Sequence, residues 1–359
     1  MTSHSIPTNS LSFRSRFSLP RSTRAWALLL AVSGVVGGGC ASSSTEAQST
    51  SPVKLTRLSD RVQIDVEGKP FTEYVFGSSS ARPFLYPLLS ADGTKLTRDF
   101  PMANVPGEEQ DHPHHRSVWF GHGIVNGTDF WLEFERDNTT PSSKAGKIIQ
   151  ESFEETSSGK VGVLRAKRRW EAPGGQVVAR DELTVRVQAI PEGRLLDYEI
   201  TLHAPTNAPL TLGDTKEGSM AVRVPLWMTL THKFKGKQVV SGGRLIDSEG
   251  REGGDVWGKR AAWADYSAEK DGKRYGISIF DHPQNPRHPT WWHARDYGLF
   301  AANPFGRHDF ENLKDQPNIG DMTVPAGGKV TFRYRLYIHE GDTSRSTIVQ
   351  RYQAYSAGK

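Results

Sequence analysis

Histidine is concentrated in two short stretches of the 359-residue chain. Of its 12 histidines, four (His112, His114, His115 and His122) lie in one stretch, and four more lie within residues 282–308. Imidazole titrates near neutrality and can transfer protons, and neutral imidazole also binds transition metals. We expect catalysis or substrate binding here. A metal site at His112, His114 and His122 and a purely structural histidine loop are the alternatives.

The first stretch adds a carboxylate and a guanidinium to its histidines. If the segment is extended, His112 and His114 project to one side. Asp111 and Arg116 flank them and are predicted to contact a substrate. Asn126 follows in an Asn-Gly turn signal, where it either orients a ligand or shapes the turn.

A short charged segment between glycines supplies the next candidates. Residues 213–218 contain Asp214, Lys216 and Glu217, and the strand-like segments around them include Arg223. A carboxylate held in such a place can act as a general base whose pKa depends on burial and on the neighbouring lysine. The alternative is a solvated charged turn.

The second histidine stretch combines aromatic faces with hydrogen-bonding groups. Its candidates are Trp291, Trp292, His293, Arg295 and Asp296. Flat apolar rings beside polar donors suit a sugar, which has apolar C–H faces and a ring of hydroxyls. The alternative is one core tryptophan with a structural Arg295–Asp296 ion pair.

Other chemistries have little support in the sequence. It contains no Gly-x-Ser-x-Gly elbow, no phosphate-binding loop and no glycine-rich dinucleotide motif. No organic cofactor is therefore predicted, and a divalent metal stays open as an alternative.

Apolar and polar residues alternate along several segments, as is typical of strands with one buried face. Residues 330–338 show the pattern most clearly, and residues 62–66, 177–187 and 196–202 repeat it. The sequence therefore predicts an all-β fold, a large antiparallel β-sandwich over residues 53–342.

Three segments depart from this alternation. Residues 100–126 and 282–304 are rich in proline, histidine and asparagine, and we expect irregular loops there. Residues 343–359 are predicted to form a short C-terminal helix packed on the sandwich. Asp342 is its expected cap, and Ile348, Tyr352 and Tyr355 share one face.

The N-terminus is typical of an export signal. A basic segment precedes an apolar run at residues 25–36, three glycines and Cys40, the only cysteine. We expect a lipoprotein signal at residues 1–39, lipidation of Cys40 and a flexible tether at residues 40–52, with an ordinary secretory signal as the alternative. The expected location is the periplasmic face of the outer membrane, with membrane contact through the lipid alone.

The net charge of the chain beyond the signal does not favour a nucleic-acid partner. Residues 1–39 carry four arginines and no acid, so without them the 45 basic residues become 41 against 40 acidic ones, a net charge of +1. Nucleic-acid binding needs a concentrated basic surplus.

Three long motifs resemble a bacterial domain family labelled PmoA-related. They read DHPHHRSVWFGHGIVNGTDFW from residue 111, GDTKEGSMAVRVP from residue 213, and GISIFDHPQNPRHPTWWHARDYGLFAANPFG from residue 276. The label suggests a methane monooxygenase subunit. That reading is rejected because such a subunit is an integral membrane protein, and the chain beyond the signal has no apolar run near the roughly 20 residues needed to span a bilayer.

The resemblance instead implies a supersandwich similar to galactose mutarotase. In such folds a histidine and a carboxylate act at the sugar ring, which implies His115, His122 or His293 as the acid and Glu217 as the base. The expected function is an exported carbohydrate-active enzyme of the epimerase, glycoside hydrolase or lyase type. A noncatalytic carbohydrate-binding lipoprotein is the alternative.

Overall fold

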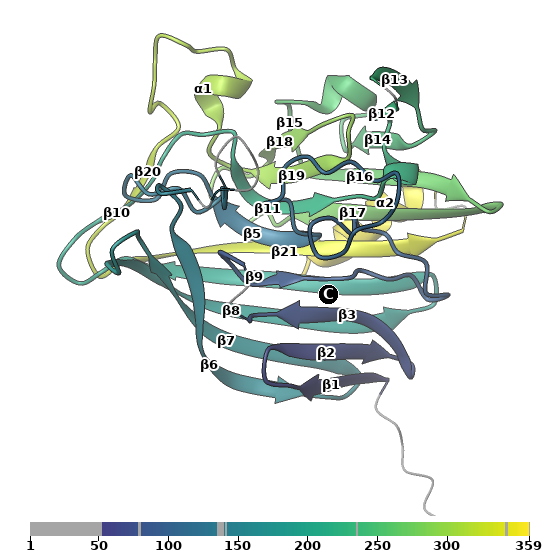
Figure 1. Cartoon of the computed structure of the whole chain (residues 1–359), viewed down its shortest axis with the longest axis horizontal. Coiled ribbons are helices and arrows are strands. Elements are labelled where there is room, and N and C mark those ends of the chain that lie inside the picture. The colour runs from purple at the N-terminus through teal and green to yellow at the C-terminus, as the bar shows by residue number, and fades with distance from the viewer. Residues whose placement is uncertain are drawn as a thin grey trace, which may run out of the picture. The chain divides into compact units, whose positions relative to one another are not determined.

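Alternating strands form two large antiparallel sheets in the computed structural model, which describes residues 52–77, 80–134, 140, 142–234, 236–341 and 344–358. Within these residues, the nine-stranded sheet has the spatial order β1 (Val53–Arg57), β2 (Arg61–Val66), β3 (Lys69–Val75), β4 (Phe84–Leu85), β5 (Val118–His122), β11 (Gly218–Arg223), β19 (Leu299–Asn303), β18 (Thr290–Ala294) and β15 (Arg260–Ala261). The eight-stranded sheet has the order β14 (Arg244–Asp247), β16 (Trp263–Lys270), β17 (Lys273–Asp281), β21 (Lys329–Glu340), β9 (Gly193–His203), β8 (Val177–Ile190), β7 (Val161–Glu171) and β6 (Lys147–Ser157). The predicted all-β sandwich is confirmed (Figure 1).

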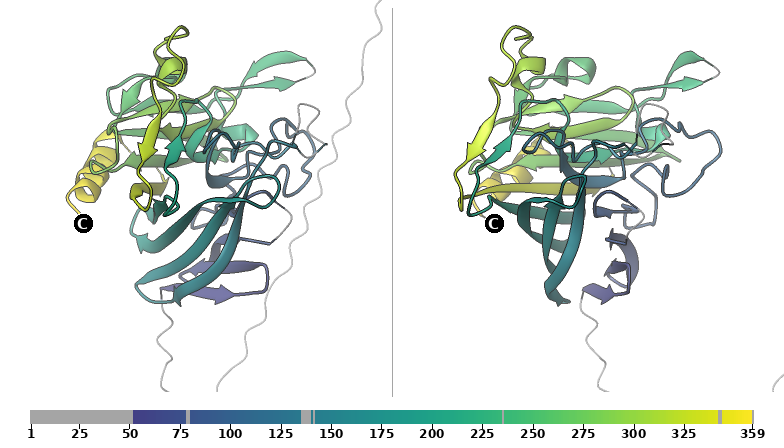
Figure 2. Two further views of the ribbon diagram at one scale, coloured as in Figure 1. Left: turned by 90° about the vertical axis from the view of Figure 1, so that its left-hand side faces the viewer. Right: turned by 60° about the vertical axis from the view of Figure 1, so that its left-hand side comes forward.

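Smaller elements decorate the sheets. They are the pairs β10 (Leu210–Leu212) with β20 (Met322–Val324) and β12 (Thr231–Phe234) with β13 (Lys237–Val240), the helices α1 (Arg307–Phe310) and α2 (Arg345–Ser356), and the 3₁₀ turns η1 (Leu226–Met228) and η2 (Gly253–Val256). The β12–β13 hairpin projects from the body in both views of Figure 2. None of the described helices has the length and hydropathy needed to cross a membrane.

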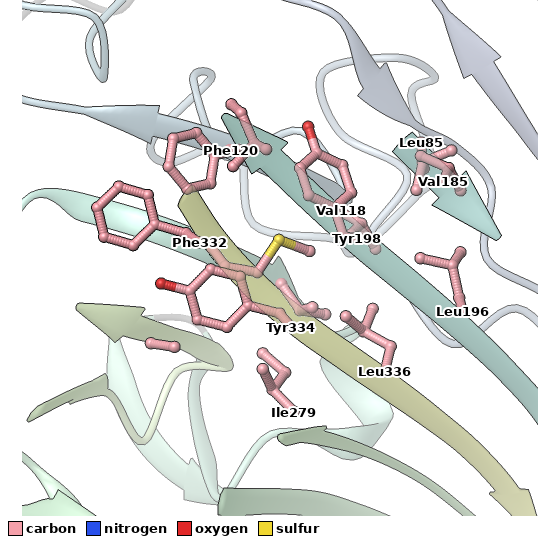
Figure 3. Packing of buried hydrophobic residues seen from close by; sticks show 14 of the residues in the cluster. Leu85, Val118, Phe120, Val185, Leu196, Tyr198, Ile279, Phe332, Tyr334 and Leu336 are labelled. Carbon is pink, nitrogen blue, oxygen red and sulfur yellow. The ribbon is translucent and has the colours of Figure 1, made fainter. Parts of the chain in front are cut away.

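The main core lies between the two sheets (Figure 3). Phe120 on β5 has its ring centroid 6.3 Å from that of Tyr198 on β9 and 6.1 Å from that of Phe332 on β21. On β21 the residues predicted to share one face, among them Tyr334 and Leu336, are buried in this cluster. Burial of apolar side chains between the layers is therefore the main stabilising contact of the sandwich.

Helix α2 covers part of the outer face of the eight-stranded sheet. Its Ile348 and Tyr355 are buried against Phe280 and Tyr337, as the predicted helical spacing requires. The N-cap is Ser344, whose Oγ accepts a hydrogen bond from the backbone N–H of Thr347. The predicted cap Asp342 lies outside the described residues, as do the predicted signal, Cys40 and residues 41–51 of the tether.

Two segments predicted to be irregular contain central strands. Residues 100–126 include β5, and residues 282–304 include β18 and β19. The expectation of irregular loops was therefore wrong for these residues. All residues of the three strands are buried, on both faces of the sheet. A strand covered on both faces has no polar side, so its sequence does not alternate.

Candidate functional site

Four neighbouring strands present one row of side chains on the outer face of the nine-stranded sheet. Trp119 on β5 pairs with Ala221 on β11, Ala221 pairs with Ala301 on β19, and Ala301 pairs with His293 on β18. Directly paired residues share a face, so Trp119 and His293 flank two small alanines. Arg223 lies two residues beyond Ala221 on β11 and faces the same way.

Asp111 and His112 form a hydrogen-bonded pair beside this face. Nδ1 of His112 lies 2.6 Å from Oδ2 of Asp111. An ionised carboxylate only accepts hydrogen bonds, so Nδ1 carries a proton and Nε2 is the ring nitrogen that is left for a ligand. The His112 side chain is 43% exposed, so the ring reaches solvent. This is the geometry of an oriented general base.

Two buried arginines hold Asp111 in its ionised form. Oδ1 of Asp111 accepts hydrogen bonds from Nη1 of Arg98 and, at 2.9 Å, from Nη2 of Arg223. Burial favours the protonated acid, but the hydrogen bond with His112 and the charges of Arg223 and Arg98 hold the pKa of Asp111 well below its usual range.

The backbone of His112 is not extended. Its φ of 45° lies in the left-handed region, which costs an L-residue about 1–2 kcal/mol. The expectation that His112 and His114 project to one side of an extended segment is therefore wrong. Arg98 donates from Nη2 to the carbonyl oxygen of His112 at 2.9 Å, which stabilises this conformation.

The ring of His112 is stacked between two others. Its centroid lies 4.7 Å from that of His115 and 5.5 Å from that of Tyr297, with interplanar angles of 6° and 9°. The guanidinium of Arg223 lies 4.6 Å from the Tyr297 centroid. Through Tyr297, the loop between β18 and β19 contacts the first histidine stretch.

Glu133 holds the first histidine stretch in place through ion pairs with two buried arginines. Its Oε1 accepts from Nη1 of Arg82 at 2.9 Å, and its Oε2 accepts from Nη2 of Arg116 at 2.9 Å. All three side chains are buried. Arg116, predicted to contact a substrate, is committed to this ion pair. Burial lowers the pKa of Arg82, against the attraction of Glu133.

A pocket of about 500 Å³ opens beside the Asp111–His112 pair. Tyr297 and Asp296 line it from the loop between β18 and β19. Residues of the β12–β13 hairpin, among them Thr231 and Gln238, line it beside Asp296. Thr231 and Gln238 both donate to Oδ2 of Asp296, at 2.8 and 3.2 Å. Asp296, predicted to bind a substrate, therefore bonds to the hairpin, and not to Arg295 as in the alternative.

The segment that carries Glu217 lies close to both stretches. Nδ1 of His293 donates to the carbonyl oxygen of Lys216 at 2.8 Å, and the carbonyl oxygen of Glu217 accepts from the backbone N–H of Gly123 at 2.7 Å. The Glu217 side chain is 31% exposed, with Oε1 3.2 Å from Nζ of Lys216. Its carboxylate is therefore partly accessible to a ligand.

Charges from the Glu217 segment and from the first histidine stretch both change the pKa of Tyr297. Burial raises its pKa to about 12, against the charges of Arg223 and Arg295, and the charges of Glu217 and Asp111 add to the rise. The negative charges of Glu217 and Asp111 thus both act on one phenol.

The three histidines predicted as acids are neutral near pH 7. Burial lowers the pKa of His293 to about 3 and that of His122 to about 4, and it takes that of His115 well below its usual value.

Backbone acceptors fix which ring nitrogen carries the proton. His293 and His122 use their protonated nitrogens on the carbonyl oxygens of Lys216 and Gly213, each at 2.8 Å, so their other nitrogens hold no proton to give. His115 differs because its Nδ1 lies 3.2 Å from Nη1 of Arg223, a group that only donates. The free Nε2 of His115 therefore carries the proton.

Several predicted site residues lie elsewhere. His122 and Trp292 belong to strands of the site, but each is offset by one residue from the outward-facing position, so both face the core. Trp292 packs in the main core and donates from Nε1 to the carbonyl oxygen of Ala261. Asn126 forms its turn, accepting from the backbone N–H of Thr211 at 2.7 Å.

The remaining predicted residues make internal contacts. Asp214 is buried and accepts from the backbone N–H groups of Gly320 and His308, which fixes the loop geometry. Trp291 faces outward beneath the guanidinium of Arg260, 4.7 Å from its ring. His114 is buried edge-on against His115, and burial keeps its pKa well below the usual value.

The proposed metal ligands do not come together. Among the described residues, no group of three or more histidine, cysteine or acidic side chains has the arrangement to hold a metal ion. His122 faces the core at Gly213, away from the pocket beside His112.

The sequence did not indicate which residues position the Asp111–His112 pair and the first histidine stretch. Arg98, Glu133 and Arg82 stand alone in ordinary strand or loop segments, and nothing in their spacing marks them. Tyr297 lies within the third motif, and an aromatic residue next to Asp296 was a usable signal.

The chain is similar in fold to several solved structures. A galactose mutarotase-like protein from Lactobacillus casei ATCC 334 is 11% identical, with a TM-score of 0.38 over 80% of this chain and 100% of that one. A galactose mutarotase related enzyme from Lactobacillus acidophilus is 7% identical, with a TM-score of 0.32 over 80% and 97%. A polysaccharide lyase is 13% identical, with a TM-score of 0.30 over 76% of this chain and 32% of that one.

No curated protein matches the sequence. A family model does match, over residues 61–353, and this range contains both large sheets except β1 as well as every predicted residue of the outer-face site. The chain therefore belongs to the family of unknown function DUF6807.

Proposed function

We propose that this protein acts on a carbohydrate by acid–base chemistry centred on Asp111 and His112. The observation that carries the proposal is the pair itself. A carboxylate held ionised by Arg98 and Arg223 orients a partly exposed imidazole at the edge of a 500 Å³ pocket. A histidine that is oriented through Nδ1 and reaches solvent is suited to exchange a proton with a sugar hydroxyl or carbon.

The other groups around the pocket suit a sugar. The ring of Tyr297 offers an apolar face to C–H groups, and Asp296 and Gln238 offer hydrogen bonds to hydroxyls. The charge of Glu217 acts on the same phenol, and this partly exposed residue supplies a second carboxylate in the proposal. In this proposal His112 is the first candidate for the group that takes a proton from the substrate. Glu217 keeps its predicted role as a base and is the second candidate.

The test is turnover of sugars by the purified protein. A panel of neutral and acidic monosaccharides and oligosaccharides is first ranked by the thermal stabilisation that each one gives. Each stabilising sugar is then assayed by NMR for epimerisation, by reducing-end release for hydrolysis and by ultraviolet absorbance of a new C=C bond for elimination. Turnover that disappears in His112→Ala supports the proposal. Turnover that persists in this variant contradicts it.

A noncatalytic carbohydrate-binding role is the second candidate. The observation that favours it is the burial of His115 and His293, which keeps their pKa values far below neutral. This role predicts that a sugar stabilises the protein against heat and is recovered unchanged.

We further propose that the chain is exported and lipid-anchored through Cys40 at the periplasmic face of the outer membrane. The support is the sequence of residues 1–40, with its basic segment, apolar run and single cysteine. A relation to proteins labelled PmoA is likewise proposed from the three sequence motifs alone.

A further inference from the structure

A second and larger pocket shares His232 with the pocket beside the Asp111–His112 pair. Its volume is about 840 Å³, and both pockets are lined by His232 of the β12–β13 hairpin. Residues 105–108 line the larger pocket and residues 109–112 line the smaller one, so one stretch of chain borders both. A ligand longer than one sugar unit could therefore extend from the Asp111–His112 pair past His232.

Trp227 provides an aromatic surface in the larger pocket. It lies in η1 and is only partly buried. Tyr275 packs edge-on against its indole with centroids 6.0 Å apart, which fixes the ring. The ammonium of the exposed residue Lys270 lies over this ring, 5.3 Å from its centroid, so a ligand that stacks on this face displaces one exposed lysine side chain. A fixed indole that lines the pocket together with an exposed lysine suits stacking against a sugar ring once the lysine moves aside.

Two exposed valines lie among the charged and polar residues that line this pocket. Val105 is 41% exposed and Val240 is 79% exposed, and both line the pocket. Exposed apolar side chains that gather around a hollow are typical of a ligand-binding surface.

The charged residues that line the two pockets indicate which class of sugar they can bind. The two pockets together are lined by six acidic residues (Asp99, Glu108, Glu109, Asp111, Glu269 and Asp296) and three lysines (Lys95, Lys233 and Lys270). Lys95 is paired with Asp99 at 2.6 Å. Arg98 and Arg223 beside Asp111 add two positive charges, so the lining is close to charge balance and gives a uronate or a sulfated sugar no net attraction, which favours a neutral ligand.

We propose that the larger pocket is a second subsite, which binds the adjoining units of a neutral oligosaccharide whose reacting unit occupies the pocket beside His112. This inference rests on the proposed function and names its substrate class. Trp227 is the platform of the second subsite, and Val105 and Val240 are its apolar rim.

The test compares affinities for neutral oligosaccharides of increasing length with those for their monosaccharides. The probes are xylo-, manno-, cello- and malto-oligosaccharides, with oligogalacturonates as the anionic comparison. In the wild-type protein we expect affinity to rise with length in at least one neutral series and in no anionic one. Trp227→Ala is expected to weaken oligosaccharide binding roughly tenfold and to leave monosaccharide binding unchanged.

Two further variants keep the result interpretable if Trp227→Ala does not fold. Val240→Glu alters a largely exposed side chain, so folding is not at risk, and it is expected to reduce the gain with length by placing a hydrated charge at the rim. Trp257→Ala is the matched control, because Trp257 is also partly buried but lines neither pocket.

The outcomes separate this inference from the proposed function. Equal affinity for monosaccharides and oligosaccharides, or a gain with length that survives both Trp227→Ala and Val240→Glu, overturns the second subsite alone. Tighter binding of oligogalacturonates overturns the neutral class. Failure of every sugar in the panel to bind overturns the proposed function as well.

Discussion

His293 donates from Nδ1 to the carbonyl oxygen of Lys216 at 2.8 Å, so strand β18 holds the residue next to Glu217. Because the burial of this ring lowers its pKa to about 3, the contact gives His293 a positioning role. Two substitutions separate positioning from proton transfer. We expect His293→Ala to reduce turnover about tenfold, since a small displacement of a reacting group is costly.

The matched variant is His293→Asn. The amide Nδ2 of asparagine can occupy the place of Nδ1–H and keep the bond to the Lys216 carbonyl oxygen, although it cannot transfer a proton. We therefore expect it to restore most of the turnover lost in His293→Ala. A His293→Asn variant as inactive as His293→Ala would instead assign His293 a direct chemical role.

Glu133 is the counter-charge of two buried guanidiniums. Replacing it with glutamine leaves Arg82 and Arg116 without an anion in the protein interior, and breaking such a pair costs about 3–5 kcal/mol. We expect Glu133→Gln to lower the free energy of unfolding by that amount, as measured by denaturant titration.

Glu154→Gln is the control for Glu133→Gln. Glu154 pairs with Lys167 on the surface, where both side chains are almost half exposed, and such pairs contribute little. We expect almost no change in its unfolding midpoint. Equal effects of the two substitutions would show that the buried pair does not hold the histidine loop.

Acid should destabilise the protein partly through His122. Burial lowers its pKa from 6.5 to about 4, so between these values the unfolded chain binds a proton that the folded protein does not. The free energy of unfolding should therefore fall as pH drops from 6.5 to 4, by about 3 kcal/mol at most from this ring. Above pH 6.5 the ring contributes no slope.

His122→Gln isolates that contribution. Glutamine can still donate to the Gly213 carbonyl oxygen but does not titrate. Denaturant unfolding at several pH values should show a shallower acid slope in this variant and a constant difference from the wild type above pH 6.5. Parallel curves down to pH 4 would contradict the assignment.

Cys40→Ser tests the lipid anchor. The hydroxyl cannot form the thioether of a lipidated cysteine, so we expect the protein to move from the membrane fraction to the soluble periplasmic fraction. Fractionation with mass spectrometry of the new N-terminus measures both effects. An unlipidated wild-type protein with a cleavage site elsewhere would favour the ordinary secretory signal.

The fold class could be predicted because strands with one wet face alternate. In β9, Leu196, Tyr198 and Ile200 are buried while the residues between them are less so. Strands β5, β18 and β19 escaped prediction because both of their faces are covered, which removes the polar half of the pattern.

The residue types in the sequence predicted the candidate site, and the directions of the side chains in the structure changed which of those residues belong to it. Composition located Asp111, His112 and Glu217, because clustered titratable groups stand out in a sequence. It could not show that Trp292 and His122 face the core, since a shift of one residue along a strand reverses the face. Nor could it show that Arg98 contacts Asp111, because that contact depends on the tertiary fold.

The most direct test of the central claim is the turnover number of His112→Ala on the sugar that the panel identifies. His203→Ala, which removes a partly exposed histidine that lines neither pocket, serves as the control. Loss of a general base predicts a fall of about 100-fold or more for His112→Ala, with an unchanged melting temperature and a fully active control. Turnover by His112→Ala at the wild-type rate would contradict the account.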